Sequence, residues 1–149
     1  LTGCQLEIGQ NETVFEHEKF SQTLQKCERY YQKSYIHSEV PGGNYNSGTG
    51  TQKGINIVQS NYNTTQNQTI YLQQEFRVKM RDAPTIVYYN PYNGDTGKIQ
   101  HYPSGRSHTV ASAFQCENGF RIGATSLDSE GNNNGGDHYA FHFTADDEL

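Results

Sequence analysis

The chain has 149 residues, a length that suits one domain or a small domain with an N-terminal extension. Only 32% of its residues are hydrophobic and 18% charged, so its polarity comes mainly from Asn, Gln, Ser and Thr, and the high charge typical of disorder is absent. A net charge of -5 without a basic cluster argues against nucleic-acid binding, and no apolar run approaches the roughly 18 residues of a membrane-spanning helix.

The first predicted elements are an extended lead-in over residues 1–18 and a connecting helix over residues 19–35. Four residues recur at i, i+4, i+7 and i+11, which places them on one face of an α-helix: Phe20, Leu24, Cys27 and Tyr31. Since the rest of the chain predicts strands and polar loops, we interpret this helix as a joint. Its apolar stripe is expected to pack on the sheet or on sister helices.

Residues 36–149 are predicted to form a C-terminal β-domain. In the clearest strand, Gln68–Met80, apolar and polar residues alternate until Gln74 interrupts the apolar face, so we expect a bulge or a change of strand there. Asn93-Gly94 predicts a hairpin turn. Strands are expected at Gly54–Ser60, Gln68–Met80, Thr85–Asn90, Lys98–Tyr102, His108–Gln115, Phe120–Thr125 and His138–Ala145. The expected fold class is a mainly β, antiparallel sandwich or jelly roll with one N-terminal helix.

Two segments carry distinctive patterns. In the lead-in, LEIGQNETVFE fits LExGxxATxFE at Leu6, Glu7, Gly9, Thr13, Phe15 and Glu16, and departs from it at Glu12. In the helix region, the pattern LxxCxRYYxKSY is matched by Leu24, Cys27, Arg29, Tyr30, Tyr31, Lys33, Ser34 and Tyr35. Together they resemble a junction of bacteriophage virion proteins, in which a carbohydrate-binding-module-like jelly roll leads into a C-terminal β-domain.

The second half of the chain extends this resemblance through Met80-Arg81, Pro84, Gly97-Lys98 and the ending Tyr139–Leu149. The resemblance implies a non-enzymatic structural protein of the virion. The leading expectation is the C-terminal domain of a tail fibre or appendage, assembled as a homotrimer and binding the host surface, where a glycan is a possible partner. The alternatives are a capsid decoration or cement protein, a free carbohydrate-binding module, and a glycan hydrolase. We expect no cofactor. The chain begins at Leu1 rather than Met, so we expect a fragment or a processed product, with residues 1–18 as the remnant of a preceding module.

Aromatic residues in or beside Asn- and Gly-rich turns are the candidate ligand-binding residues. Tyr offers an apolar ring with a polar tip, which suits both sugar recognition and protein docking. The alternative is that these rings pack beneath their own loops. The candidates are Tyr45, Tyr62, Tyr92, His101 and Tyr102.

A second group of residues is expected to form a structural junction or interface. Arg29 beside two tyrosines could hold a ligand by stacking, but we interpret the group as packing that attaches the helix to the sheet or to another subunit. Its members are Phe20, Leu24, Cys27, Arg29, Tyr30 and Tyr31.

Metal and catalytic sites are not expected. The three cysteines, Cys4, Cys27 and Cys116, lack CxxC spacing and are interpreted as free, buried thiols, with one disulfide and one unpaired cysteine as the alternative. His138 and His142 share one face of a strand and are expected to face solvent. Four residues could line a calcium loop, but their spacing does not fit an EF-hand: Asp128, Glu130, Asn132 and Asp137.

No nucleophile motif is present, and five acids that could pair as glycosidase carboxylates are interpreted as solvated faces and caps: Glu16, Glu18, Glu28, Glu75 and Asp82.

Overall fold

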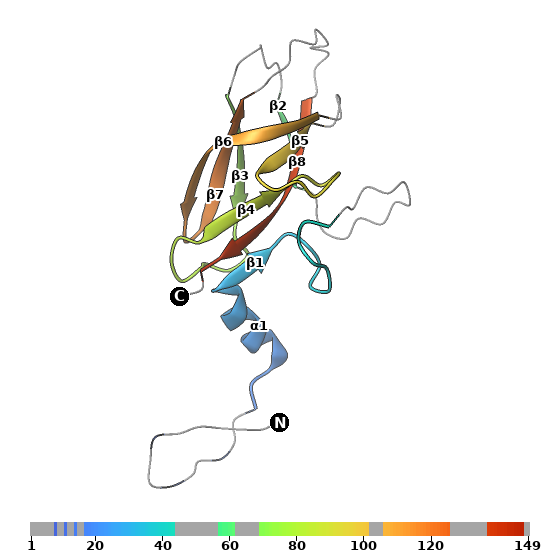
Figure 1. Ribbon diagram of the computed structural model, residues 1–149. Helices are drawn as coiled ribbons and strands as arrows, with labels where there is room; N and C mark the ends of the chain where they lie inside the picture. The colour runs from blue at the N-terminus through green and yellow to red at the C-terminus, as the bar shows by residue number, and fades with distance from the viewer. Residues whose placement is uncertain are drawn as a thin grey trace.

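The computed structural model describes residues 8, 11, 14, 17–43, 57–61, 69–101, 106–125 and 137–147. These residues form α1 (Phe20–Glu28), β1 (Tyr31–Lys33), β2 (Ile57–Asn61), β3 (Thr69–Glu75), β4 (Thr85–Tyr89), β5 (Lys98–His101), β6 (Arg106–Cys116), β7 (Gly119–Thr125) and β8 (Asp137–Asp146). The prediction of a mainly β fold with one N-terminal helix is confirmed, and Figure 1 shows α1 projecting from one end of the strands. Within the described ranges, no helix has the length and apolar character needed to cross a membrane.

The strands pair antiparallel in one sheet that curls into a half-barrel around β8. The first half of β8 lies between β2 and β5, and its second half lies between β1 and β4. From β5 the sheet continues through β6 and β7 to β3, and a register shift between Val110 and Ser112 lets β6 pair with both neighbours. The sequence predicts a sandwich or jelly roll, in which two layers of strands face each other. In the structure, the strands that face each other belong to the two ends of one continuous, curled sheet.

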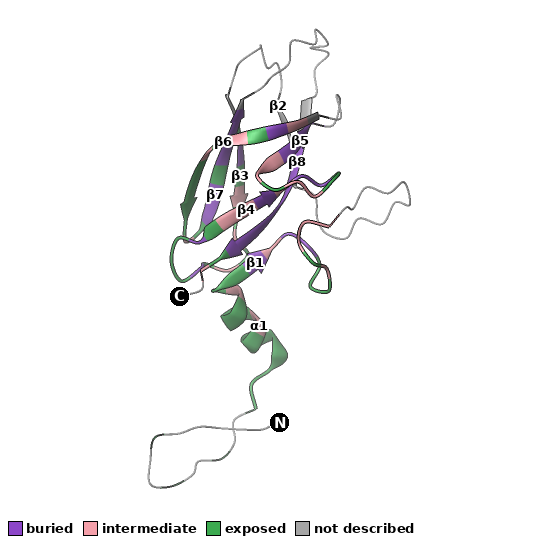
Figure 2. Cartoon of the chain, in the orientation of Figure 1, coloured by how far each residue is buried: buried purple, intermediate pink, exposed green. Residues whose placement is uncertain are grey.

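The hydrophobic core lies inside this curl. Phe120 of β7 packs against Phe143 of β8, with 4.9 Å between ring centroids, and against Phe141 at 6.0 Å. Leu72 of β3 and Ile122 of β7 are fully buried beside them. Figure 2 shows the same pattern, since β8 is coloured as buried over most of its length while α1 is coloured as exposed.

His142 of β8 is buried, so the prediction that it faces solvent is wrong. Only 2% of this residue is exposed, and its ring stacks on Tyr35 with 4.2 Å between centroids. The Ser34 hydroxyl lies 2.9 Å from Nδ1 of His142, and burial lowers the pKa of His142 to about 4. The chain just after β1 covers the second face of β8, which a two-residue alternation cannot reveal. The structure describes the backbone of His138 but not its side chain, so the prediction for His138 stays a prediction.

The helix is shorter than predicted, because α1 ends at Glu28 and residues 31–33 form β1. The N–H of Arg81 donates to the carbonyl of Arg29 (2.9 Å), and the N–H of Asp147 donates to the carbonyl of Tyr30 (2.8 Å). These tertiary bonds take acceptors that a continuing helix would have used, and aromatic residues favour a strand at this position.

Gln32 on β1 fastens the end of the helix to the sheet. Its side-chain nitrogen donates to the carbonyls of Glu28 (3.0 Å) and Val78 (2.6 Å), and its side-chain oxygen accepts from the N–H of Arg77 (3.0 Å). Gln32 is buried, so these three bonds satisfy a polar group that would otherwise be costly to bury. Gln32, which was not among the predicted junction residues, therefore connects the helix to the sheet.

The predicted strand Gln68–Met80 ends at Glu75, one residue after the predicted interruption at Gln74. Beyond it, the chain bends, and the N–H groups of Phe76 and Met80 donate to the β6–β7 turn at Asn118 and Glu117, each at 2.9 Å. The bend keeps Met80 in the core, which explains why the apolar pattern continues past the end of the strand.

The turn predicted at Asn93-Gly94 is present between β4 and β5, but these strands do not form a hairpin. β4 pairs with β8, and β5 pairs with β6 and β8, while an isolated bridge between Tyr89 and Thr96 joins the two sides of the turn. Gly94 has φ 77°, a left-handed conformation that favours glycine, and its N–H donates to the carbonyl of Asn90 (2.9 Å). Asn90 is fully buried; its side-chain nitrogen donates to Gln100 (2.8 Å), and its side-chain oxygen accepts from the N–H of Tyr92 (2.7 Å).

Candidate functional site

A group of exposed side chains covers the outer side of β3, β7 and β6. On β3, Leu72 points into the core, so its neighbours along the strand point outward. On β7, Arg121 is exposed between two buried core residues for the same reason. We call the resulting set the Arg121 face, defined by Tyr71, Gln73, Glu75, Phe114 and Arg121.

Arg121 lies at the centre of this face. It is directly opposite Gln73 of β3 and Phe114 of β6 in the sheet register, and Tyr71 lies two residues along β3. Its guanidinium carbon is 4.8 Å from the ring centroid of Tyr71 and 5.0 Å from that of Phe114. The cation thus makes contact with two aromatic rings, one from each neighbouring strand, which restricts its orientation.

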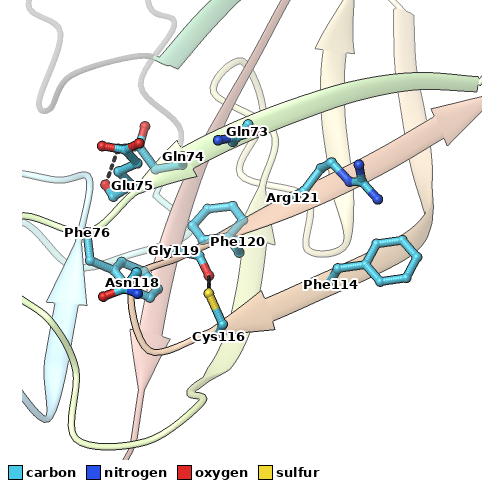
Figure 3. A pocket seen from close by; sticks show the side chains of 10 residues that line it. All are labelled: Gln73, Gln74, Glu75, Phe76, Phe114, Cys116, Asn118, Gly119, Phe120 and Arg121. Atoms are coloured by element: carbon cyan, nitrogen blue, oxygen red, sulfur yellow. Dashed lines mark hydrogen bonds between the residues drawn. The ribbon is translucent and has the colours of Figure 1, made fainter.

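The two rings remain accessible, with Tyr71 50% and Phe114 56% exposed. Phe114 and Arg121 also line an open hollow of about 620 Å³, and Figure 3 shows their side chains projecting from adjacent strands. Tyr71 lies outside the lining of this hollow. The polar part of its lining comes from Gln73, Gln74, Glu75, Asn118 and Arg121. Aromatic surface, amide groups and one cation therefore meet at a single shallow site.

Arg121 makes no ion pair with a described carboxylate. Glu117 pairs with Lys79 (2.5 Å) and Glu28 with Arg77 (3.6 Å), whereas no carboxylate of the described residues lies within ion-pair distance of Arg121. A guanidinium in this position can bind a carboxylate through two parallel hydrogen bonds. Across the described part of the chain, no group of three or more His, Cys, Asp or Glu residues is placed to hold a metal ion.

Of the five predicted ligand-binding residues, the structure describes two, and they lie in different environments. Tyr92 is 53% exposed at the β4–β5 turn, whereas His101 is buried and stacks on Tyr139 with 4.7 Å between centroids. His101 therefore packs in the interior against the neighbouring strand β8. The remaining three candidates, Tyr45, Tyr62 and Tyr102, lie outside the described residues.

The predicted junction residues are mostly exposed. α1 contains no buried residue: Phe20 is 82% exposed, and Leu24 is half-buried. Arg29 and Tyr31 are exposed, and Tyr30 lies under the guanidinium of Arg81, 5.7 Å from it. The stripe therefore does not pack into the core of its own sheet, while its packing against sister helices stays a prediction.

The cysteine prediction needs a correction. Cys27 and Cys116 are free thiols, as expected, but both are exposed, because one lies on the solvated helix and the other on the outer side of β6. Cys4 lies outside the described residues, as does the loop part of the weighed calcium site. Of the acids weighed for catalysis, Glu18 pairs with Lys26, an interaction that lowers its pKa, and Glu28 pairs with Arg77.

The sequence interpretation missed Phe114 and Arg121, and it used Tyr71 only as the polar side of a strand. One signal was present, since an aromatic residue at a position expected to face water is a marker of binding surfaces. The pairing of β7 with both β3 and β6, which brings these residues together, is visible only in the tertiary structure.

The chain was compared with protein-family models, curated proteins and solved structures. No family model, no curated protein and no solved structure matches the chain.

Proposed function

We propose that this chain is a non-enzymatic structural protein of a bacteriophage virion, acting as the C-terminal domain of a tail fibre or appendage that binds the host surface. The observation that carries the binding role is the Arg121 face, where two exposed rings flank an available guanidinium beside an open hollow. The virion assignment rests on the resemblance of the junction Leu24–Tyr35 and of the ending Tyr139–Leu149.

The ion pairs favour a binding role over a catalytic one. Glycoside hydrolysis needs two facing carboxylates, one of them able to donate a proton. Glu18 and Glu28 are instead occupied by Lys26 and Arg77, and Glu75 is the carboxylate that lines the hollow.

A homotrimer is part of this proposal. α1 exposes Phe20 and projects from the sheet, so its apolar surface gains by packing against copies of the same helix. A helix of nine residues is too short to be stable alone, which is a further reason for it to have a partner.

The second candidate is a capsid decoration protein, in which α1 packs on a neighbouring capsid subunit. The exposure of Phe20 favours this role as much as the first, because both roles cover the helix with another chain. A free carbohydrate-binding module is the third candidate, and it would use the Arg121 face without a virion.

Immunolabelling of intact particles in the electron microscope separates these candidates. Label on the tail is the result expected for the fibre domain, and label on the head would replace it with the decoration protein. Particles without label, from a preparation in which the protein is detected in the lysate, would overturn both virion roles.

A further inference from the structure

We propose that the Arg121 face binds a carboxylate-bearing sugar of a surface polysaccharide, with Arg121 holding the carboxylate. The inference deepens the proposed function and rests on it for the biological setting. The site itself is argued from the contacts of the face, and its residues differ from those that the sequence patterns single out.

The charge requirement comes from Arg121. Its guanidinium lies against Tyr71 and Phe114, and no described carboxylate pairs with it. An exposed arginine with its orientation restricted by two rings loses less freedom on binding than a mobile one. A carboxylate complements this guanidinium, because its two oxygens accept two parallel hydrogen bonds.

The rest of the site favours a sugar over an acidic peptide. Amide side chains of Gln73 and Asn118 line the hollow, and amides both donate to and accept from hydroxyl groups. A sugar residue with a single carboxylate presents one charge among hydroxyls and matches this lining.

The two rings supply apolar contact for the sugar. Tyr71 and Phe114 are about half exposed and stand on strands on either side of β7. The C–H faces of a pyranose can pack on such rings while its hydroxyls reach the amides. The hollow is open, so it can accept a residue within a polymer as well as a chain end.

The test measures binding of the full chain to three immobilised acidic polysaccharides, namely polygalacturonate, alginate and polysialic acid. Each is paired with a neutral form in which the carboxyl groups are esterified. We expect at least one acidic form to bind about tenfold or more tightly than its ester, since a charge-assisted bidentate contact contributes about that factor or more. Arg121→Gln should remove this preference, and Arg121→Lys should restore part of it.

Two further sets of variants complete the test. Tyr71→Ala and Phe114→Ala should weaken binding of both forms, because they remove ring contact with the sugar. They should also reduce the preference for the acidic form, because they release the orientation of Arg121. The matched control is Arg81→Gln, which removes an arginine–tyrosine contact of the same kind at Tyr30, away from the face, and should leave binding unchanged.

Two results would overturn the inference: no acidic polysaccharide binds better than its ester, or Arg121→Gln binds as the wild type does while circular dichroism shows both folded. Immunolabelling of particles tests the virion role without reference to sugar chemistry. Label on the tail together with no acidic preference would reject the ligand class alone, whereas the reverse pattern would reject the virion role alone.

Discussion

α1 and β8 lie in the same chain but in opposite environments. Every residue from Tyr139 to Ala145 of β8 is buried, whereas α1 has no buried residue. β8 has strands on both edges and side chains over both faces, so it organises the fold. α1 is attached at its C-terminal end, through Gln32 and the bonds at Arg29 and Tyr30. Folding stability should therefore depend on β8, and assembly on α1.

The same substitution at two phenylalanines tests this contrast most strongly. Phe141→Ala removes a fully buried ring from the core, and we expect it to lower the free energy of unfolding by about 3–5 kcal/mol. Phe20→Ala, the matched control on α1, should cost less than about 0.5 kcal/mol in the monomer. Urea titration followed by circular dichroism measures both. Equal losses would mean that α1 has a packing partner within the chain.

His142 should make the stability of the sheet depend on pH. Its pKa is lowered to about 4 in the folded chain by burial, while the ordinary value near 6.5 applies when it is unfolded. The unfolded chain therefore binds a proton first, and stability should fall between about pH 6.5 and pH 4, by about 3 kcal/mol in total.

His142→Gln should flatten this part of the profile, since glutamine does not titrate. The control is His37→Gln, at an exposed turn, which should keep the wild-type slope. Chemical denaturation at a series of pH values measures each profile. A wild-type slope in His142→Gln would show that another group is responsible.

Alanine substitutions at two glycines of the β4–β5 connection distinguish the cost of backbone strain from the cost of a steric collision. Gly94 and Gly97 have nearly the same φ, 77° and 73°, so alanine at either should cost about 1 kcal/mol. A Cβ at Gly94 would also collide with the carbonyl oxygen of Gly42, whereas one at Gly97 meets nothing. Thermal unfolding should therefore show the larger loss for Gly94→Ala. A larger loss for Gly97→Ala would contradict the close approach of the two loops.

The smallest effect on stability is expected for Phe20→Ser, which should change assembly instead. Sedimentation at micromolar concentration should give a trimer for the wild type and a smaller species for this variant. Ile36→Ser, an exposed apolar residue outside the helix, is the control and should sediment as the wild type. A monomeric wild type would reject the trimer.

The sequence predicted those features that depend on neighbours along the chain. Alternation located β3 to β8 to within a few residues, and Asn93-Gly94 located its turn, because strand period and turn chemistry are local properties. The helix was extended too far because its end is set by Arg81 and Asp147, which are distant in sequence. The Arg121 face was missed because its residues come from three strands whose order alternation does not encode.

The sequence by itself determined the fold class, since an alternating, aromatic-rich and turn-rich chain has few ways to bury its apolar residues other than an antiparallel sheet. Only the tertiary structure decided which residues are covered. His142 is buried because the segment after β1 lies over it, and Phe114 is exposed because it lies on the outer side of β6. Burial depends on contacts between distant segments, so the same residue types have opposite roles in β8, in α1 and on the Arg121 face.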